Sequence, residues 1–407
     1  MADHQGTILI DKDLRPAYYD DFHCLAADCR FSCCKGWRIS FDKRDYLSLK
    51  RQAGSPEFNT RIENALRRIR KDPPAGHYGE FDMHTGACPL LREDCLCALQ
   101  LEKGHSALPK VCQVFPRGES YVSSGYLERS LSPACEGVLE LLWNLPEGIA
   151  FRSDPLPKDK WKRMRIREGQ PLAEYFPVVR EWCVDRLQDR RFPIPERLLI
   201  LGMGLWRLAE GEAVEEWLPW ALALPENTDG LTIEQSDRAL SKFLSSNLRV
   251  LTRIKVSGTN FQGIRGELAK GVGIQIRIRA EESVLSIPIQ PYREAQGRYN
   301  AAFKEREYFM ENLLVALLFH LYMPDLSSPE ALWKSYANLC SLYSFYRFAA
   351  VMSCREGASG DKAELFRLMV CVSRGLIHNR GFQNTIRDEL FQHDSATLAH
   401  MAILLCG

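Results

Sequence analysis

Apolar residues recur at helical spacing along most of the second half of the chain. Three stretches carry apolar residues three and four positions apart: 172–190, 195–210 and 233–248. This spacing predicts amphipathic helices. The pattern is helical again from Tyr299 to Leu405, where 308–322 and 332–353 are apolar and aromatic on most faces. Helices of that kind are buried, so we expect these two segments to form a buried packing layer.

One region departs from the helical period. Between 249 and 290, apolar residues alternate with polar ones in three runs: Val250, Ile254 and Val256; Ile274, Ile276 and Ile278; Leu285, Ile287 and Ile289. A period of two predicts strands that are apolar on one face. The sequence therefore predicts a mainly α, multi-helix protein with one small antiparallel β-sheet.

Shorter elements are predicted in the first third. Asp42 is placed as the N-cap of a helix that runs through Lys50. A second, basic amphipathic helix is predicted over 58–71, ended by the prolines of 72–74. The stretch 76–86 is predicted to be a loop with strand-like pieces.

Two glycine pairs resemble fragments of nucleotide-binding loops. Gly202 and Gly204 lie inside a predicted helix, and Gly271 and Gly273 come before a predicted strand instead of after one. A phosphate-binding glycine loop needs a strand before it and a helix start after it. Core packing is therefore the better interpretation of the first pair, and the second is a weak candidate.

Composition indicates an ordinary globular chain. It has 407 residues, of which 45% are hydrophobic and 26% charged, with a net charge of +1. This length allows two or three domains, and the near-neutral charge gives no overall attraction to nucleic acid or membranes. The longest apolar run, 313–323, is half of the ~20 residues that a membrane span needs. Three prolines and a glycine in 144–157 predict a boundary between domains at 1–145 and 158–407.

A basic stretch follows that boundary. Residues 158–167 contain six basic side chains and one tryptophan. A solvated helix face is the favoured interpretation. A surface that docks an acidic protein or a cofactor carboxylate is the alternative. Nucleic-acid binding is disfavoured because no aromatic platform accompanies the charges.

Cysteines give the most specific chemical signal. Nine of the fourteen lie between 24 and 135, in two groups: Cys24, Cys29, Cys33 and Cys34, and then Cys88, Cys95, Cys97, Cys112 and Cys135. Thiolates suit zinc and iron–sulfur centres, which take about four each. Disulfides are disfavoured because no secretory signal is visible. The remaining five are isolated in apolar helical patterns and are predicted to be buried as small hydrophobes: Cys183, Cys340, Cys354, Cys371 and Cys406.

Spacing excludes several metal motifs. The chain lacks the paired two-residue gaps of a zinc ribbon and the repeated gaps of bacterial ferredoxins. Cys29 and Cys33 begin like the triplet of radical enzymes, but Cys34 follows at once. Zinc and iron–sulfur remain open on spacing alone.

Four segments carry a family resemblance. Residues 21–42, 88–91, 94–100 and 108–117 are similar to the bacterial flagellin lysine N-methyltransferases, and to a broader eight-cysteine domain described as zinc- or iron-chelating. The family's cysteines fall on Cys24, Cys29, Cys33, Cys34, Cys88, Cys97, Cys112 and Cys135. Cys95 stands where the family's turn has glycine, and is treated as an extra. The specific motifs cover roughly the first third of the chain.

The resemblance implies a function. It implies S-adenosylmethionine-dependent methylation of flagellin lysines by an enzyme with a 4Fe-4S cluster. The near-neutral charge and the short apolar runs predict a location in the bacterial cytoplasm, without nucleic-acid or membrane partners. The alternatives are a non-catalytic iron–sulfur or zinc protein for metal sensing or partner binding, and a binding module that the metal only staples. The long chain after Cys135 favours the enzyme.

Individual roles are less determined. Cys97 and Cys112 are predicted to close a metal site with the first group, and Cys33 and Cys34 are not expected to ligate one iron together, because adjacent side chains diverge. Which four of the eight bind stays open. His77 and His84 are candidate accessory ligands, although a surface role is favoured. No spacing singles out a catalytic base or a cofactor site among nine histidines and fourteen tyrosines.

Overall fold

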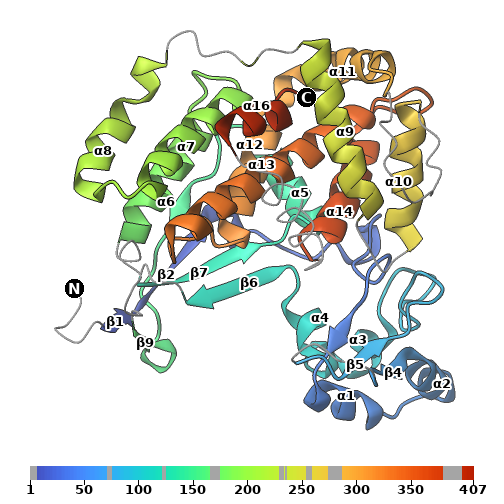
Figure 1. Cartoon of the computed structure of the whole chain (residues 1–407). Coiled ribbons are helices and arrows are strands. Elements are labelled where there is room, and N and C mark those ends of the chain that lie inside the picture. Colours follow the sequence, from blue (N-terminus) through green and yellow to red (C-terminus); the bar gives the residue numbers. More distant parts are fainter. Residues whose placement is uncertain are drawn as a thin grey trace.

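The structure is a computed structural model, and it describes residues 7–70, 76–121, 125–165, 175–228, 233, 236–253, 259–273, 287–378 and 397–407. Helices dominate the described chain, and most of them pack into one body formed by the chain after residue 135 (Figure 1). The described strands are short and lie within the first 165 residues. The predicted mainly α class is confirmed.

The helical body is built around two buried helices. Its elements are α5 (Glu136–Trp143), α6 (Phe176–Leu187), α7 (Ile194–Ala209), α8 (Val214–Ala223), α9 (Asp237–Arg253), α10 (Thr259–Gly271), α11 (Gln290–Phe303), α12 (Tyr308–His320), α13 (Pro329–Met352), α14 (Lys362–Leu376) and α16 (Leu398–Leu405). Nearly every residue of α12 is buried, and α13 packs against α7, α9, α11, α14 and α16. The predicted burial of 308–322 and 332–353 is thus confirmed for α12 and α13.

Side-chain caps define where several helices begin. The Asp42 carboxylate accepts from the Asp45 amide at 2.8 Å, so the predicted N-cap of α1 (Lys43–Lys50) is confirmed. Ser328 and Asp361 cap α13 and α14 in the same way, at 3.0 and 2.9 Å. Each cap satisfies an amide that has no partner within its own helix.

The glycine pair inside α7 is a packing device. A Cβ at Gly202 would lie 2.2 Å from the Tyr336 hydroxyl oxygen, and one at Gly204 would lie 2.2 Å from the Trp182 ring. Both distances are far below van der Waals contact. The two glycines therefore let α13 and α6 approach α7, which confirms the core-packing interpretation.

Three small sheets lie in the first part of the chain. The largest has the order β6 (Arg117–Tyr121), β7 (Tyr126–Leu131), β2 (Lys12–Pro16), β8 (Phe151–Arg152), with β2 and β7 parallel and the other pairs antiparallel. β1 (Thr7–Ile10) pairs with β9 (Lys162–Arg165), and β5 (Gly79–Phe81) lies between β3 (Ser40–Phe41) and β4 (Leu66–Arg68).

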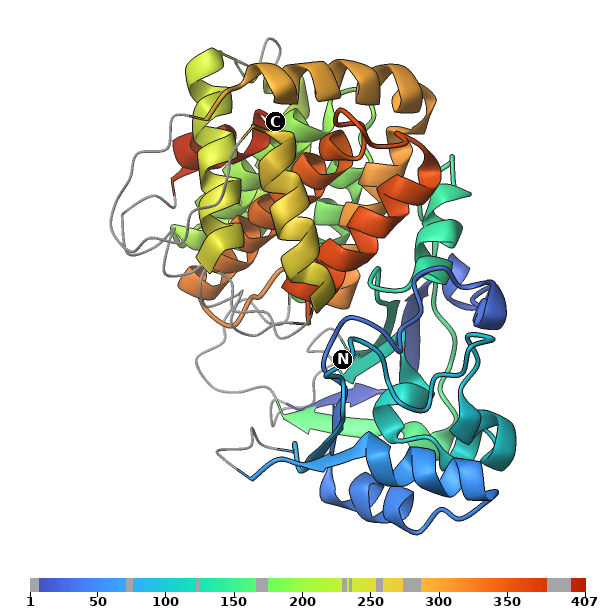
Figure 2. The ribbon, with the colours of Figure 1, turned by 90° about the vertical axis from the view of Figure 1, so that its right-hand side faces the viewer.

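The four-stranded sheet joins the helical body through α12 and α6. Phe151 of β8 stacks on Phe319 of α12 with ring centroids 4.5 Å apart. The buried carboxylate of Glu128 in β7 pairs with the guanidinium of Arg180 in α6 at 3.0 Å. Figure 2 shows the helical body above and the cysteine-rich part below, with the sheet between them.

Two residues predicted to lie in strands between 249 and 290 are not in strands. Val250 is in α9, so the strand predicted there is wrong: the helical spacing of Leu244, Leu248 and Leu251, all buried, outweighs the local alternation. Ile289 directly precedes α11. The remaining predicted strand positions, except Ile287, lie outside the described residues.

Two other predicted elements differ. The helix predicted over 58–71 is α2 (Pro56–Ala65); it ends at Ala65 because Leu66 enters β4 and pairs with β5. The basic stretch after Lys160 forms strand β9, not a helix face. None of the described helices has the length and apolar character needed to cross a bilayer. The division at 144–157 stays a prediction.

Candidate metal centre and its junction with the helical body

Backbone pairing brings the two cysteine groups together. The Cys88 amide donates to the Cys34 carbonyl at 2.8 Å, beside an antiparallel bridge between Lys35 and Ala87. A second bridge joins Leu91 to Cys97. The segments around the two groups therefore converge, as predicted, although many residues separate them in the sequence.

Five thiols interact with one another around Cys33, which is exposed, whereas Cys88 is buried. They are those of Cys33, Cys34, Cys88, Cys97 and Cys112. Cys34 donates a hydrogen bond to Cys33, and this bond, followed by the nearby Arg374 charge, lowers the pKa of Cys33 to about 7. Burial, reinforced by the charges of neighbouring thiols, raises the pKa of Cys88 to about 12 and raises that of Cys97 and Cys112. One thiolate thus suppresses ionisation of the others.

This donor set fits a thiolate-held group in its chemistry. A buried thiolate cluster is costly without a cation, and a bound metal makes deprotonation of its ligands favourable. Across the described part of the chain, no three histidine, cysteine or carboxylate side chains are arranged as ligands of one metal ion. Ligation of a metal stays a prediction.

Short helices present two of these thiols. Cys97 is the N-cap residue of α3 (Ala98–Lys103), and Cys112 lies inside α4 (Lys110–Val114), between Pro109 and Pro116. Cys112 is therefore presented from a short helix and not from an extended turn. The two prolines flank a helix of little more than one turn, and the Cys112 thiol on this helix is half-buried.

The other three predicted cysteines, Cys24, Cys29 and Cys135, interact electrostatically through Cys135, which also interacts with Cys33. Cys135 is the N-cap residue of α5. Burial raises the pKa of its thiol, and the charges of the nearby Cys33 and Cys24 thiols raise that pKa further. The Cys29 thiol lies 3.5 Å from a carboxylate oxygen of Glu136, and burial with this carboxylate raises the pKa of Cys29 to about 12.

Residues expected to be peripheral are so placed. Cys95 has a φ of 62°, the left-handed region that favours glycine, which explains the glycine expected in this turn. The His84 side chain is 72% exposed and pairs with Asp82. His77 contacts Ser40. His84 thus lies at the surface, whereas His77 is half-buried.

Arg374 fastens the first cysteine group to the helical body. From α14, its guanidinium donates to the carbonyls of Phe31, Ser32 and Lys35 at 2.5, 3.1 and 3.1 Å, and to that of Ala134 at 3.2 Å. The group is buried, and it lies over the Trp37 ring. The Arg374 side chain thus links the backbone of residues 31–35 to the backbone at Ala134.

Two histidines lie next to this junction. The Ser130 hydroxyl is 3.2 Å from Nδ1 of His320, and the Ser132 hydroxyl is 3.0 Å from Nε2 of His378. The two imidazole rings are 5.9 Å apart. The pKa of both histidines is lowered to about 4, mainly by burial. The charge of His378 also lowers the pKa of His320, and the charge of Arg374 also lowers that of His378. Both are therefore neutral at ordinary pH.

The surroundings of the histidines are aromatic and crowded. Trp37 lies 5.0 Å from the His378 ring, and Phe115 lies 5.1 Å from Trp37. A Cβ at Gly118 would be 2.8 Å from the Ser130 hydroxyl. Tyr322, beside the same serine, has a φ of 54°. A strained non-glycine residue next to neutral histidines is typical of a functional site.

Sequence patterns did not identify these residues. His320 is the last residue of α12, Arg374 lies in the last turn of α14, and His378 follows that helix by two residues, so each is a polar residue closing an apolar run. That signal is weak, because a solvated helix end produces it as well.

The described chain is thus a mainly helical protein in which most of the cysteines lie in the first third of the sequence. A family model described as "FliB lysine N-methylase C-terminal domain" matches residues 180–404, more than half of the chain. The chain therefore belongs to the FliB lysine N-methylase C-terminal domain family. No solved structure matches.

Curated relatives match a shorter part. A "Lysine-N-methylase" of Salmonella choleraesuis and one of Salmonella typhimurium are each 34% identical over 141 residues, which is 33% of this chain and 33% of each relative. A "Flagellar biosynthetic protein FliU" of Salmonella muenchen is 33% identical over 141 residues, 33% of this chain and 79% of that protein. The match spans about a third of the two lysine-N-methylases.

Proposed function

We propose that this chain is an S-adenosylmethionine-dependent methyltransferase that N-methylates lysine side chains of flagellin in the bacterial cytoplasm. The observation that carries the proposal is membership of the lysine N-methylase domain family over 180–404. The names of the Salmonella relatives support the lysine substrate and the flagellar context.

Methyl transfer to lysine requires a neutral amine. Free lysine has a pKa of ~10.4, so a site must favour the uncharged form by burial or by nearby positive charge. The site of His320 and His378 meets both conditions, since it is buried beside Arg374. Its neutral imidazoles can accept a hydrogen bond from the amine. We place the reacting amine here.

Positioning is the second requirement. The amine, the methyl carbon and the sulfonium sulfur must lie in line, and holding them so lowers the barrier. The rings of Trp37 and Phe115 exclude water, and Ser130 and Ser132 fix the imidazole orientations.

The cofactor part of the proposal is a 4Fe-4S cluster. Cys88, Cys97 and Cys112, with Cys33 or Cys34, would hold it. Such a cluster binds deprotonated thiolates and ties their loops together. Arg374 sets the orientation of the loop that carries Cys33.

Methylation of flagellin tests the proposal. Anaerobically reconstituted protein is incubated with S-adenosylmethionine and purified flagellin, and the intact mass of flagellin is measured. A gain of methyl groups, mapped to lysines by peptide sequencing, is expected. The control is His320→Gln, which keeps a neutral side chain but changes the site. Unchanged flagellin mass with the wild-type protein contradicts the proposal.

A non-catalytic metal protein is the second candidate, supported by the thiol set around Cys33. It predicts metal binding without affinity for S-adenosylmethionine. Titration of S-adenosylmethionine into the reconstituted protein, followed by calorimetry, separates the two candidates.

A further inference from the structure

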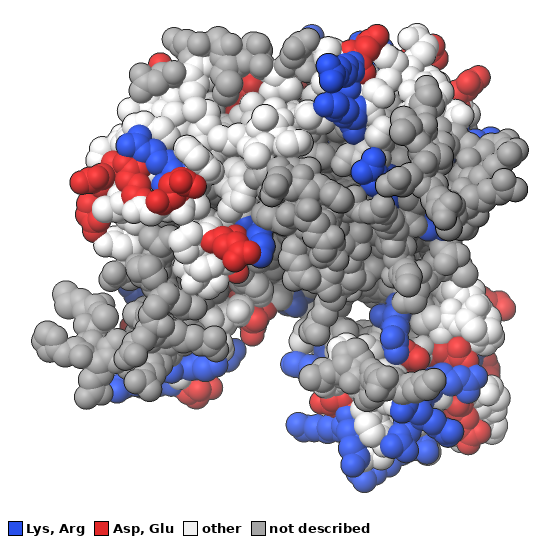
Figure 3. Space-filling model, viewed as in Figure 1, with Lys and Arg blue, Asp and Glu red and all other residues white. Residues whose placement is uncertain are grey.

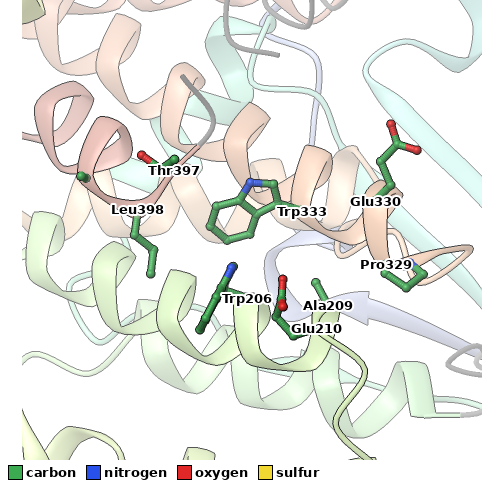
Figure 4. A pocket seen from close by; sticks show the side chains of 9 residues that line it. Trp206, Ala209, Glu210, Pro329, Glu330, Trp333, Thr397 and Leu398 are labelled. Carbon is green, nitrogen blue, oxygen red and sulfur yellow. The ribbon is translucent and has the colours of Figure 1, made fainter. Parts of the chain in front are cut away.

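A groove opens on the helical body among α7, α13 and α16. Its volume is about 630 Å³, and its described lining is Trp206, Ala209, Glu210, Pro329, Glu330, Trp333, Thr397, Leu398 and Ala399. Figure 4 shows the two indoles and the Glu210 carboxylate on the groove walls, with Leu398 at one end.

Two helices each contribute one tryptophan and one glutamate. On α7, Trp206 and the C-cap residue Glu210 are one turn apart, and on α13 Glu330 and Trp333 are likewise one turn apart. Trp206 and Glu210 point to the same side of α7, whereas the Glu330 carboxylate points away from Trp333 (Figure 4). The groove thus has aromatic walls with the Glu210 carboxylate beside them.

Trp206 forms an exposed wall of the groove and Trp333 a half-buried one. Trp206 is 47% exposed, unusual for so large an apolar side chain. The ring centroids of Trp333 and the fully buried Tyr336 are 4.9 Å apart. Tyr336 and Leu398 both pack against Gly202 of α7. The close packing at Gly202 therefore fixes the positions of both helices.

Charge in the groove is acidic. The described lining holds two carboxylates and no lysine, arginine or histidine. Glu330 pairs with Lys334 one turn on, whereas within the described residues the Glu210 carboxylate makes no ion pair. Acidic side chains also gather on the part of the surface over α7 and α8 (Figure 3).

We propose that this groove binds a second lysine side chain, with its flanking residues, of the protein substrate, distinct from the lysine that reacts at His320 and His378; the inference rests on the proposed methyltransferase function and specifies its substrate docking site. The aliphatic stem of the lysine packs between Trp206 and Trp333, and its ammonium group lies at Glu210. A cation over an indole face is attracted by the ring, and a carboxylate adds to this attraction.

The chemistry of the walls distinguishes this ligand from the methyl donor. S-adenosylmethionine carries a carboxylate as well as a sulfonium cation, and the described lining offers that carboxylate no cationic partner. A lysine side chain has no such requirement. Methylation keeps the positive charge, so the groove retains a substrate segment in both states.

Peptide binding to the full-length protein tests the inference. The probe is a fluorescently labelled flagellin peptide with one central lysine, measured by anisotropy beside versions with trimethyllysine and acetyllysine. We expect binding of the first two and not of the acetylated peptide. Trp206→Ala is expected to weaken binding by about five-fold, as the loss of a cation–π contact of about 1 kcal/mol predicts. Glu210→Gln should weaken it by about three-fold and reduce its salt dependence.

The control is Glu216→Gln, which removes an exposed carboxylate from the neighbouring α8 and should leave the affinity unchanged. In turnover assays, the groove variants should raise KM for flagellin without changing KM for S-adenosylmethionine. Wild-type affinity in both groove variants, or equal binding of the acetylated peptide, overturns the inference. A weakened affinity for S-adenosylmethionine in Trp206→Ala assigns the groove to the methyl donor instead.

Failure of the proposed function has a different signature. If flagellin is not methylated but the peptides show the expected pattern, the groove assignment stands and the methyltransferase proposal falls. If flagellin is methylated and the groove variants bind like wild type, only the groove assignment falls.

Discussion

Arg374 and Phe31 are 343 positions apart in the chain, yet a guanidinium nitrogen of Arg374 donates to the Phe31 carbonyl at 2.5 Å. The same side chain also contacts the carbonyls of three other residues around the first cysteine group. No other described side chain from the second half of the chain binds so many carbonyls in this loop. The helical body therefore holds the cysteine loop through the loop's backbone carbonyls, so this attachment does not depend on which side chains the loop carries.

We expect Arg374→Met to destabilise the protein by about 3 kcal/mol or more, because it leaves four carbonyls without a charged donor. Arg374→Lys should recover only part of this loss, since an ammonium group cannot reach both sides of the loop. Thermal unfolding measures the effect. Arg44→Met, which changes an exposed arginine of α1, is the control and should be neutral. A neutral Arg374→Met would show that the loop is held by other contacts.

Cysteine substitutions should separate into two classes. Cys97→Ser and Cys112→Ser are expected to lose iron and destabilise the N-terminal third, because both thiols belong to the group around Cys33. Cys183→Ser and Cys406→Ser should keep their iron, since these thiols are isolated in the helical core. Iron per chain and visible absorption of anaerobically purified protein are the measurements.

The wild-type protein should be brown, as cysteine-held iron–sulfur clusters are. A colourless protein with one zinc per chain contradicts the cluster and keeps the thiol set.

Gly202→Ala should cost about 2–3 kcal/mol, because the added methyl group meets the Tyr336 hydroxyl in a packed interface. The matched control is Gly297→Ala in α11, where no atom lies within 4 Å of the new Cβ. That change should stabilise the protein by about 0.5–1 kcal/mol through helix propensity. Chemical denaturation measures both. Equal effects of the two substitutions would mean that α7 and α13 can move apart freely.

Acid should weaken the junction. The folded-state pKa of His320 is about 4, lowered by burial and then by His378, whereas an unfolded histidine titrates near 6.5. Between these values the unfolded chain binds more protons, so this contribution to stability is complete above pH ~6.5 and is lost as pH falls toward ~4. We expect a loss of about 2–3 kcal/mol from His320 over this range.

Denaturation at several pH values checks this expectation. His320→Gln should flatten the dependence, whereas His105→Gln, which changes an exposed histidine, should not. An unchanged slope in His320→Gln would show that this imidazole is solvated in the folded protein.

Local signals predicted local structure well. Asp42 is a cap because its side chain reaches an amide three residues on, and Gly202 and Gly204 pack because a small residue in an apolar helix face permits close approach. The convergence of the cysteine groups was also readable, since thiols clustered in sequence indicate a common centre.

Tertiary contacts decided the rest. Leu66 fits a helix period, but β5 offers it a strand partner, and Val250 alternates locally within a longer helical face. Arg374, His320 and His378 acquire their surroundings from segments more than a hundred residues away, as their separations of 343, 190 and 246 positions show. No pattern within a window of sequence contains that information.

The parallel pairing of β2 with β7 has a consequence for the order of assembly. The chain leaves the four-stranded sheet at Pro16 and returns at Arg117, which pairs with Leu131 at the end of β7. Because β2 runs parallel to β7, both crossing points lie at the same end of the sheet. Residues 17–116, with most of the cysteines, are thus looped out between neighbouring points. During synthesis β2 has no neighbour in its sheet until β7 has left the ribosome, so the first strand of this sheet to be made must wait for a strand more than a hundred residues later. A protease that cuts within the loop leaves every strand pair of that sheet intact.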